Sequence, residues 1–422
     1  MRKINAILFC TIFASVLWGC SKEYDRSACP REDVVTLFYG AGFNDLSSDL
    51  TKNLKTILKG EVPFSDSKHK LLAYTHLTRS NYNYTPNGSQ LVRYSKENGA
   101  VITDTLIKFD ASRTACDPEV LKEVLLKIDE LYPGTHCGII FSSHATGWLP
   151  AGRFSSAYKP RQFSAGRPLP FYRYEEIPQD DGPRVKTFGA EVLVDGNNKY
   201  SQEMSIQSMA KAIPMHLDYI IFDACLMGGV EVAYELKDVA DLIAFSPTEV
   251  LSDGFDYSAV SRLINDKPDA KAFCEAYYDL YDRQSDQRYR SATITLIKTA
   301  ALERLAQVSK SLFAKYRSGL DALGTLSGVQ EYFRNDKHWF YDLRDILVKA
   351  GADASDLADF DAALDECIAY KATTEHFLEI NINTYSGLSM YLPGAARSDS
   401  GVDELDDFYR TLAWNKATNL VE

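Results

Sequence analysis

The stretch LDYIIFDACLMGG, residues 217–229, decides the fold. Its apolar run from Tyr219 to Phe222 is typical of a buried strand, and a helical pattern of apolar residues begins after Cys225. We therefore expect Cys225 where a core strand ends and a helix starts, at the edge of a parallel sheet where ligands bind. A thiol at a helix N-terminus lies in the positive end of the helix dipole, which favours the thiolate. A free Cys in such a place can equally be a small buried core residue.

A second stretch, HCGIIFSSHATGW at residues 136–148, has the same construction. Its apolar run from Ile139 to Phe141 predicts a core strand, and His144 follows the end of that strand. Two neighbouring parallel strands would bring His144 and Cys225 to the same edge of the sheet. A cysteine and a histidine that are distant in sequence but close in space form a nucleophile and its base.

The motifs SHATGW at 143–148 and FDACLMG at 222–228 resemble those of the clostripain family of cysteine peptidases. The resemblance extends to the opening strand, an SPTEV loop and a late strand, at residues 34–39, 246–250 and 386–393. It implies a caspase-like fold. One departure is Ala145, because proteins with this core usually carry Gly directly after the His. The backbone N–H is the expected working group there, and Ala still supplies it.

Apolar runs alternate with helical patterns along most of the chain, which predicts a mainly parallel central sheet covered by helices on both faces. Together with the resemblance, which implies the caspase-like type, we expect an α/β/α sandwich with a helical C-terminal region. We divide the chain into a signal peptide, a lipidated tether, a peptidase core, and a helical region with a strand that returns, at residues 1–19, 20–32, 33–300 and 301–422.

The first residues have the composition of a targeting segment. A basic start precedes an apolar run from Ala6 to Trp18, which is too short to span a membrane. Gly19-Cys20 after this run resembles a bacterial lipoprotein box, in which Cys20 is lipidated, and an ordinary secretory signal peptide is the alternative. We therefore expect an exported protein that is anchored through lipid to the membrane of a bacterial cell envelope.

The amino-acid composition narrows the classes of partner and cofactor that we expect the protein to bind. The net charge of −12 argues against nucleic acid and anionic membrane surfaces as ligands and is compatible with basic substrates. The eight Cys residues show no CxxC zinc spacing, so we expect the internal ones to be mostly free and buried. Some members of the resembled family need calcium, but the chain has no EF-hand spacing. We therefore predict no cofactor, leave calcium open as the alternative that the resemblance implies, and assign no metal site.

The resemblance implies a two-residue catalytic centre. Cys225 as thiolate would attack the carbonyl of the cut bond, and His144 would protonate the leaving amine. The oxyanion needs two donors, for which the backbone N–H groups of Ala145 and Cys225 are the candidates. Asp223 lies two residues before Cys225, so both side chains would point the same way on an extended strand end. Its carboxylate is the first candidate for binding an Arg or Lys substrate side chain.

Other interpretations of these acidic residues stay open. Asp223 could instead cap a helix, and Glu249 and Asp253 are weaker candidates for the same substrate pocket. The protein could also be a non-catalytic lipoprotein that binds peptides or glycans with this fold. A ligase that uses the same acyl-enzyme is a weaker third possibility.

The segment between the two motifs is the least regular part. Residues 149–186 are rich in Pro, Arg and Lys, which predicts a long surface loop beginning at the catalytic edge. Exposed loops of this kind are preferred sites of proteolysis. Because members of the resembled family are often self-cleaved here, we predict a zymogen that cuts itself after Lys159 or Arg161, with Arg153 and Arg167 as alternatives.

Overall fold

A computed structural model describes residues 33–151, 153, 171–173, 191–195 and 198–422, apart from 80–83, 86, 266, 335–336 and 398–400. The predicted signal peptide, the predicted lipidation site Cys20 and the predicted cleavage sites Lys159 and Arg161 lie outside the described residues. Within the described residues, the structure contains no helix with the length and apolar character that a membrane span needs.

The centre of the molecule is a nine-stranded sheet with the strand order β13-β11-β10-β9-β5-β1-β2-β3-β4. Its members in chain order are β1 (Val34–Gly42), β2 (His69–Leu77), β3 (Gln90–Glu97), β4 (Ala100–Lys108), β5 (His136–Ser142), β9 (Leu217–Asp223), β10 (Ala240–Phe245), β11 (Thr293–Lys298) and β13 (Ile368–Thr373). Strands β2, β1, β5, β9 and β10 run parallel, and the strands outside them pair antiparallel. The predicted mainly parallel sheet is confirmed.

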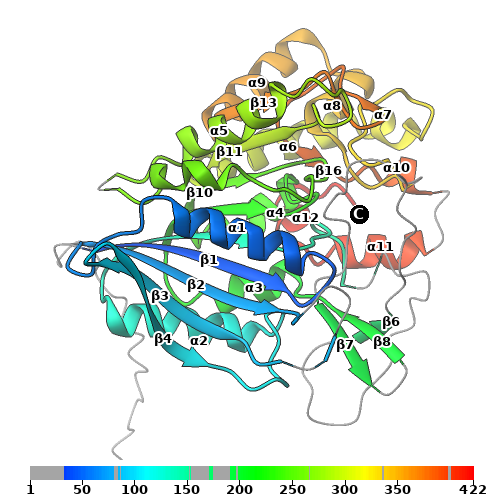
Figure 1. The fold of residues 1–422 in the computed structure, drawn as a ribbon. Coiled ribbons are helices and arrows are strands. Elements are labelled where there is room, and N and C mark those ends of the chain that lie inside the picture. The colour runs from blue at the N-terminus through cyan, green and yellow to red at the C-terminus, as the bar shows by residue number, and fades with distance from the viewer. Residues whose placement is uncertain are drawn as a thin grey trace, which may run out of the picture.

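The central strands carry the predicted apolar runs because both faces of the sheet are covered. Every residue of β1 is buried, as is β5 after its first residue. On one face lie α1 (Ser47–Lys59), η1 (Tyr257–Arg262) and α5 (Ala270–Asp282), and on the other α2 (Pro118–Leu131), α3 (Ile206–Ala212) and α4 (Val230–Glu235) (Figure 1). Asp117 caps α2 by accepting the N–H of Glu119, and Pro118 occupies the first turn, as the sequence predicts.

The C-terminal region is less uniformly helical than predicted. It contains α6 (Leu302–Lys315), α7 (Arg317–Ala322), α8 (Leu343–Lys349), α9 (Ala354–Cys367), α10 (Pro393–Ala396), α11 (Val402–Tyr409) and α12 (Ala413–Thr418). Strand β13 follows α9 and pairs with β11 at the edge of the main sheet. The strand expected near residues 388–391 is β16 (Ser389–Met390), which instead pairs with β12 (Tyr341–Asp342). The prediction that this strand could return to the main sheet is therefore wrong, because β13 takes the edge position.

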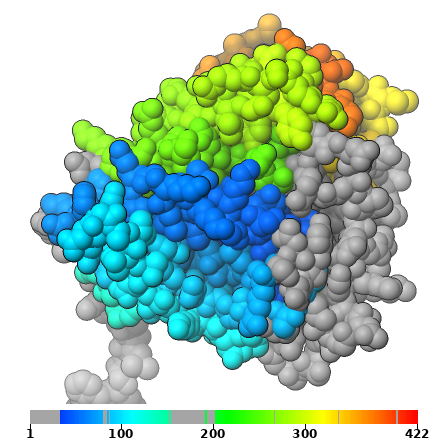
Figure 2. Space-filling view, viewed as in Figure 1, coloured from blue at the N-terminus to red at the C-terminus, as the bar shows by residue number. Residues whose placement is uncertain are grey.

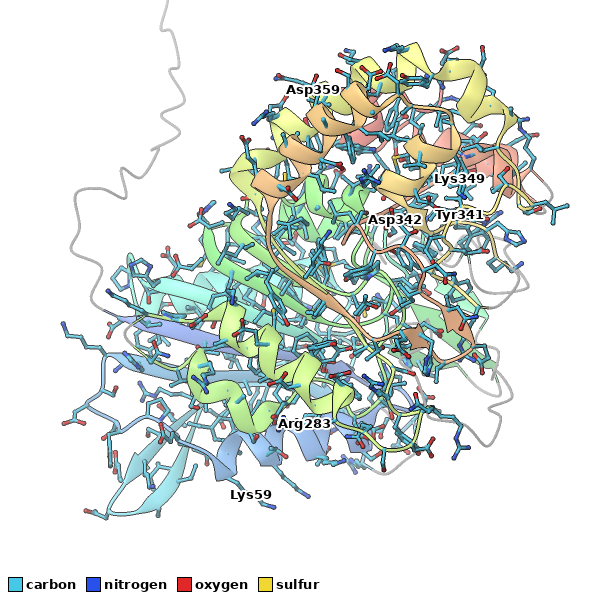
Figure 3. The ribbon with its side chains drawn as sticks, turned by 90° about the horizontal axis from the view of Figure 1, so that it is seen from above. Lys59, Arg283, Tyr341, Asp342, Lys349 and Asp359 are labelled. Carbon is cyan, nitrogen blue, oxygen red and sulfur yellow. The ribbon has the colours of Figure 1, made fainter. Side chains whose placement is uncertain are left out.

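The C-terminal region packs closely against the rest of the chain. One cluster of buried hydrophobic residues extends from Val35 in β1 to Val421. Figure 3 shows Tyr341 and Asp342 lying between the C-terminal helices and the sheet. On the face shown in Figure 2, the N-terminal and middle parts of the chain form one continuous surface.

A small second sheet lies between the two motifs in sequence. It consists of β6 (Phe171–Arg173), β8 (Asn198–Gln202) and β7 (Glu191–Asp195), in that order. Strands β7 and β8 pair antiparallel, from Glu191 with Gln202 to Asp195 with Asn198. Helix α3 follows β8 and begins at Ile206 with Ser205 as its N-cap.

Candidate active site

The register of two neighbouring strands brings His144 and Cys225 together. Strands β5 and β9 are parallel, and Ser142 pairs with Asp223 at their C-terminal ends. His144 and Cys225 each follow two residues beyond this pair. Both residues therefore leave the same edge of the sheet from adjacent strands, as the sequence predicts.

Cys225 does not stand at a helix N-terminus. Helix α4 begins only at Val230 with Gly229 as its N-cap, so the predicted contribution of the helix dipole is wrong. The helix is delayed because Leu226 has a left-handed backbone conformation, with φ of 60°. Instead, the Cys225 Sγ accepts a hydrogen bond from the N–H of Val250 at 3.2 Å. A backbone N–H donor at this place stabilises negative charge on the sulfur.

The loops that carry the two residues touch through their backbones. Gly147 has φ of 64°, and a Cβ built on it would lie 2.5 Å from the carbonyl oxygen of Leu226. The N–H of Leu226 is in turn bonded to the carbonyl of Thr248 at 2.9 Å. The two predicted oxyanion donors, the N–H groups of Ala145 and Cys225, lie on these two loops. Only Gly allows this close approach, so Gly147 sets the distance between the loops.

A third residue, Asp45, completes the arrangement around His144. The Oδ1 atom of Asp45 lies 2.7 Å from Nε2 of His144, and the side chains are 18% and 4% exposed. Nδ1 of His144 is buried and has no hydrogen-bond partner among the described residues. With Nε2 occupied by the carboxylate, Nδ1 is the ring nitrogen that remains available for another partner. A carboxylate at this position would stabilise an imidazolium if His144 took up a proton in a reaction.

The turn after β1 positions Asp45. The side chain of Asn44 accepts the N–H of Leu46 at 2.9 Å and donates to the carbonyl of Ala41 at 3.2 Å. Ser143, next to His144, also donates to the carbonyl of Ala41, at 2.7 Å. The sequence analysis missed Asp45. A signal was available, because the residues after a strand adjacent to the His strand share its edge.

Asp223 lies fully buried on the α1 face of the sheet. Its Oδ2 accepts hydrogen bonds from the hydroxyls of Ser142 and Tyr257, both at 2.7 Å. A Cβ on Gly254 would come within 2.8 Å of the same carboxylate. The alternative that Asp223 caps a helix is wrong, because Gly229 is the N-cap of α4. The carboxylate therefore belongs to the catalytic edge and is held by two neutral donors.

The two weaker acidic candidates already have cationic partners. Glu249 is 1% exposed, and its Oε2 accepts from Nε of Arg334 at 2.7 Å. Burial raises the pKa of the Glu249 carboxyl, and the Arg334 guanidinium opposes that shift. Asp253 lies at the surface, 2.6 Å from the ammonium of Lys52. The observed partners of these two carboxylates are thus Arg334 and Lys52, and not Asp223.

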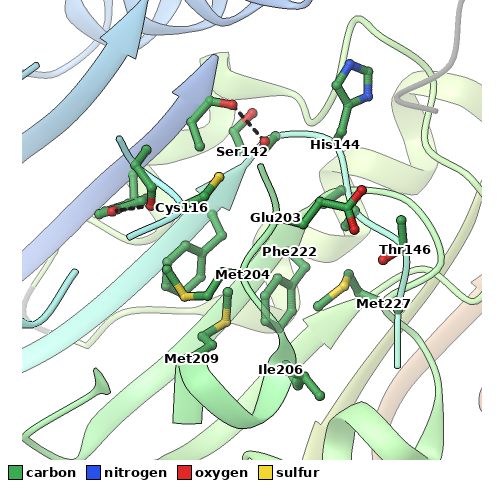
Figure 4. A pocket seen from close by; sticks show the side chains of 18 residues that line it. Cys116, Ser142, His144, Thr146, Glu203, Met204, Ile206, Met209, Phe222 and Met227 are labelled. Carbon is green, nitrogen blue, oxygen red and sulfur yellow. Dashed lines mark hydrogen bonds between the residues drawn. The ribbon is translucent and has the colours of Figure 1, made fainter. Parts of the chain in front are cut away.

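A cavity opens beside the His144 loop on the opposite face of the sheet (Figure 4). Residues 143–147 form one wall, and the floor contains Phe141 of β5 and Phe222 of β9. Met204, which precedes α3, and Ile206 and Met209 of α3 close the cavity. The lining is mostly apolar.

Within the described residues, no three or more His, Cys, Asp or Glu side chains come together in a group that could hold a metal ion. Among the residues that the structure describes, the thiols are free and buried, as predicted, and they are Cys116, Cys137, Cys225, Cys274 and Cys367.

An α/β/α sandwich that delivers a Cys and a His to one edge from adjacent parallel strands defines a cysteine peptidase of caspase-like architecture. The model of the clostripain family matches residues 191–419, more than half of the chain, and the chain belongs to this family. It is a cysteine peptidase, a hydrolase of peptide bonds. No curated protein matches the chain.

Solved structures support the same assignment. The chain is similar to an inactive zymogen C11 protease from Parabacteroides distasonis, with 26% identity and a TM-score of 0.70 over 92% of this chain and 99% of that one. It also resembles a secreted C11 cysteine protease from Bacteroides thetaiotaomicron in complex with an irreversible peptide inhibitor, with 22% identity, a TM-score of 0.70 and the same coverage. Because the identity to the Bacteroides protein is only 22%, that similarity shows a shared fold and no more.

Proposed function

We propose that this peptidase cuts peptide bonds after Arg or Lys, with Cys225 as nucleophile and His144 as general acid and base. The pairing of Ser142 with Asp223 carries the proposal, because it sets the reactive residues side by side at one edge. The thiolate of Cys225 attacks the scissile carbonyl, and the N–H groups of Ala145 and Cys225 bind the oxyanion. His144 then protonates the leaving amine, and water hydrolyses the thioester with His144 as base.

Asp223 would select the basic side chain before the cut bond. It lies two residues before the nucleophile and is fully buried, so its carboxylate meets a substrate cation in surroundings that exclude water. Ser142 and Tyr257 fix its orientation before substrate arrives. A neutral or acidic substrate side chain would leave this carboxylate without a charged partner, which costs a few kcal/mol.

Self-cleavage in the 149–186 loop would activate the enzyme. Cys225 is 1% exposed and Asp223 is fully buried, so a peptide can reach neither residue until the catalytic edge opens. The similar C11 protease from Parabacteroides distasonis is an inactive zymogen in its solved structure, which supports this proposal. Among the predicted sites, Lys159 is followed by Pro160, whose ring restricts the preceding residue, so Arg161 is preferred.

Arg153 is the alternative site that the structure describes. Its guanidinium lies over the ring of Trp339, 5.4 Å from the centroid. This stacking holds the side chain against the C-terminal region, which disfavours Arg153 as the point of cleavage. Lipidation of Cys20 would hold the enzyme on a membrane of the bacterial envelope, with peptides as its soluble substrates.

One experiment tests these proposals together. The purified mature protein is incubated with quenched peptides that differ only in Arg, Lys, Asp or Asn before the cut bond. Cys225→Ala and His144→Ala should abolish cleavage, and Asp223→Asn should remove the preference for Arg and Lys. On a denaturing gel the wild type should form two fragments and Cys225→Ala one full-length band. Full activity of either dyad variant would refute the dyad, and an active uncut wild type would refute self-activation.

A further inference from the structure

The cavity beside His144 lies on the face of the sheet opposite to Asp223. Tyr39, Phe141 and Phe222 stand in register on β1, β5 and β9, and all three line the cavity. The next residues in register, Ser142 and Asp223, point to the other face because strand side chains alternate. The hydrogen bond from Tyr257 of η1 to Asp223 confirms that face. The His144 loop therefore has the buried carboxylate of Asp223 on one side and an apolar cavity on the other.

The side chains of an extended substrate would face these two sides alternately. Successive side chains of an extended peptide point in opposite directions. If the residue before the cut bond places its side chain toward Asp223, the side chain of the residue after the cut bond points toward the cavity. The leaving amine must lie within proton-transfer distance of His144, so the residue after the cut bond lies against the His144 loop. Ala145 and Thr146 of that loop form part of the cavity wall.

We propose that this cavity is the subsite for the residue immediately after the cut bond, and that it selects a large apolar side chain such as Leu, Met or Phe. The inference rests on the proposed function and adds a second determinant of specificity. The walls are made of flexible Met204, Met209 and Met227 over the ring of Phe222. Met side chains adapt to apolar groups of different shape, which fits a site that accepts several large residues.

The cavity also disfavours acidic residues. Glu203, which is 8% exposed, lines it beside the loop of His144, and Figure 4 shows its carboxylate close to Thr146. A substrate Asp or Glu in this cavity would lose its hydration and face a like charge. The subsite should therefore rank large apolar residues first, Gly and Ser next, and acidic residues last.

The test uses quenched peptides that keep Lys before the cut bond and vary only the next residue among Leu, Met, Phe, Gly and Asp. The wild type should cleave the Leu, Met and Phe peptides with kcat/KM at least about tenfold above the Gly peptide. Met204→Trp should fill the cavity and remove this difference, whereas Met204→Leu, the matched control, should keep it. In both variants the preference for Lys over Asp before the cut bond should persist, because Asp223 lies on the other face.

Each remaining outcome counts against the inference. Equal kcat/KM for all five peptides in a wild type that still requires Lys would overturn the subsite and leave the proposed function standing. So would an unchanged Leu preference in a Met204→Trp protein whose circular dichroism and melting temperature match the wild type. Absence of any thiol-dependent cleavage would overturn both proposals.

Discussion

Replacing Asp45 by Asn tests whether the carboxylate behind His144 contributes to catalysis. Asn keeps the shape of the side chain and one hydrogen bond to Nε2, but it removes the negative charge. Asp45 is not among the residues that line the cavity, so its loss should lower kcat and leave KM nearly unchanged. The rate at which iodoacetamide alkylates Cys225 should fall as well, because a less stable imidazolium supports less thiolate.

The geometry gives the expected size of the effect. Asp45 Oδ1 lies 2.7 Å from His144 Nε2, and both side chains are largely buried. Two charges about 4 Å apart at an effective dielectric constant of about 20 interact by about 4 kcal/mol. The neutral hydrogen bond that Asn retains is worth about 1 kcal/mol. The remaining 3 kcal/mol or so corresponds to a fall in kcat on the order of a hundredfold.

Asp241→Asn is the matched control, because Asp241 also lies 2.7 Å from a histidine Nε2, that of His216, but at the exposed surface. This variant should keep wild-type kcat, since exposed ion pairs contribute little. Steady-state kinetics on one Lys peptide, together with alkylation rates for both variants, make the comparison. A kcat of Asp45→Asn within about twofold of the wild type would refute the role given to the carboxylate.

Three further outcomes follow from the geometry. Gly147→Ala should lower kcat at least about tenfold, because its Cβ would lie 2.5 Å from a backbone carbonyl of the nucleophile loop, whereas Gly99→Ala, at a similar φ of 82° with open space around it, should not. Burial raises the pKa of the Glu231 carboxyl from 4.5 to about 7, so the folded state should lose about 3 kcal/mol as pH rises through this window. Denaturant unfolding at pH 5 and pH 8 should show that loss in the wild type and not in Glu231→Gln. Gly138→Ala should lower the melting temperature and cost on the order of 3 kcal/mol, because its Cβ would collide with the Tyr219 ring at 1.9 Å, and an unchanged melting temperature would contradict this.

The parts of the site that follow from strand pattern could be predicted from the sequence. The apolar runs at 139–141 and 219–222 are local signals of strands buried on both faces. His144 and Cys225 each follow one of those runs by three positions. To predict that they share an edge of the sheet, one needs only to assume that the two strands are neighbours. That assumption is correct because β5 pairs with β9.

The parts that depend on tertiary contacts could not be predicted. The helical pattern after Cys225 gives way to a turn because Leu226 is held by Thr248, a residue on another loop. The acidic candidate Glu249 is paired with Arg334, far along the chain. Strand β13 has only intermediate and exposed positions, so its sequence lacks the apolar run of the central strands.

The packing behind the nucleophile has a consequence for when the enzyme becomes active. Ser389 donates its N–H to the carbonyl of Gly228 at 2.9 Å, and Tyr391 and Tyr409 both donate to the buried carboxylate of Glu231. The turn that carries Cys225 is therefore supported by residues synthesised long after it. A growing chain on the ribosome holds the complete Cys and His motifs while this support is still missing. The order of synthesis therefore withholds this support from the turn of Cys225 until the chain has been made as far as Tyr409.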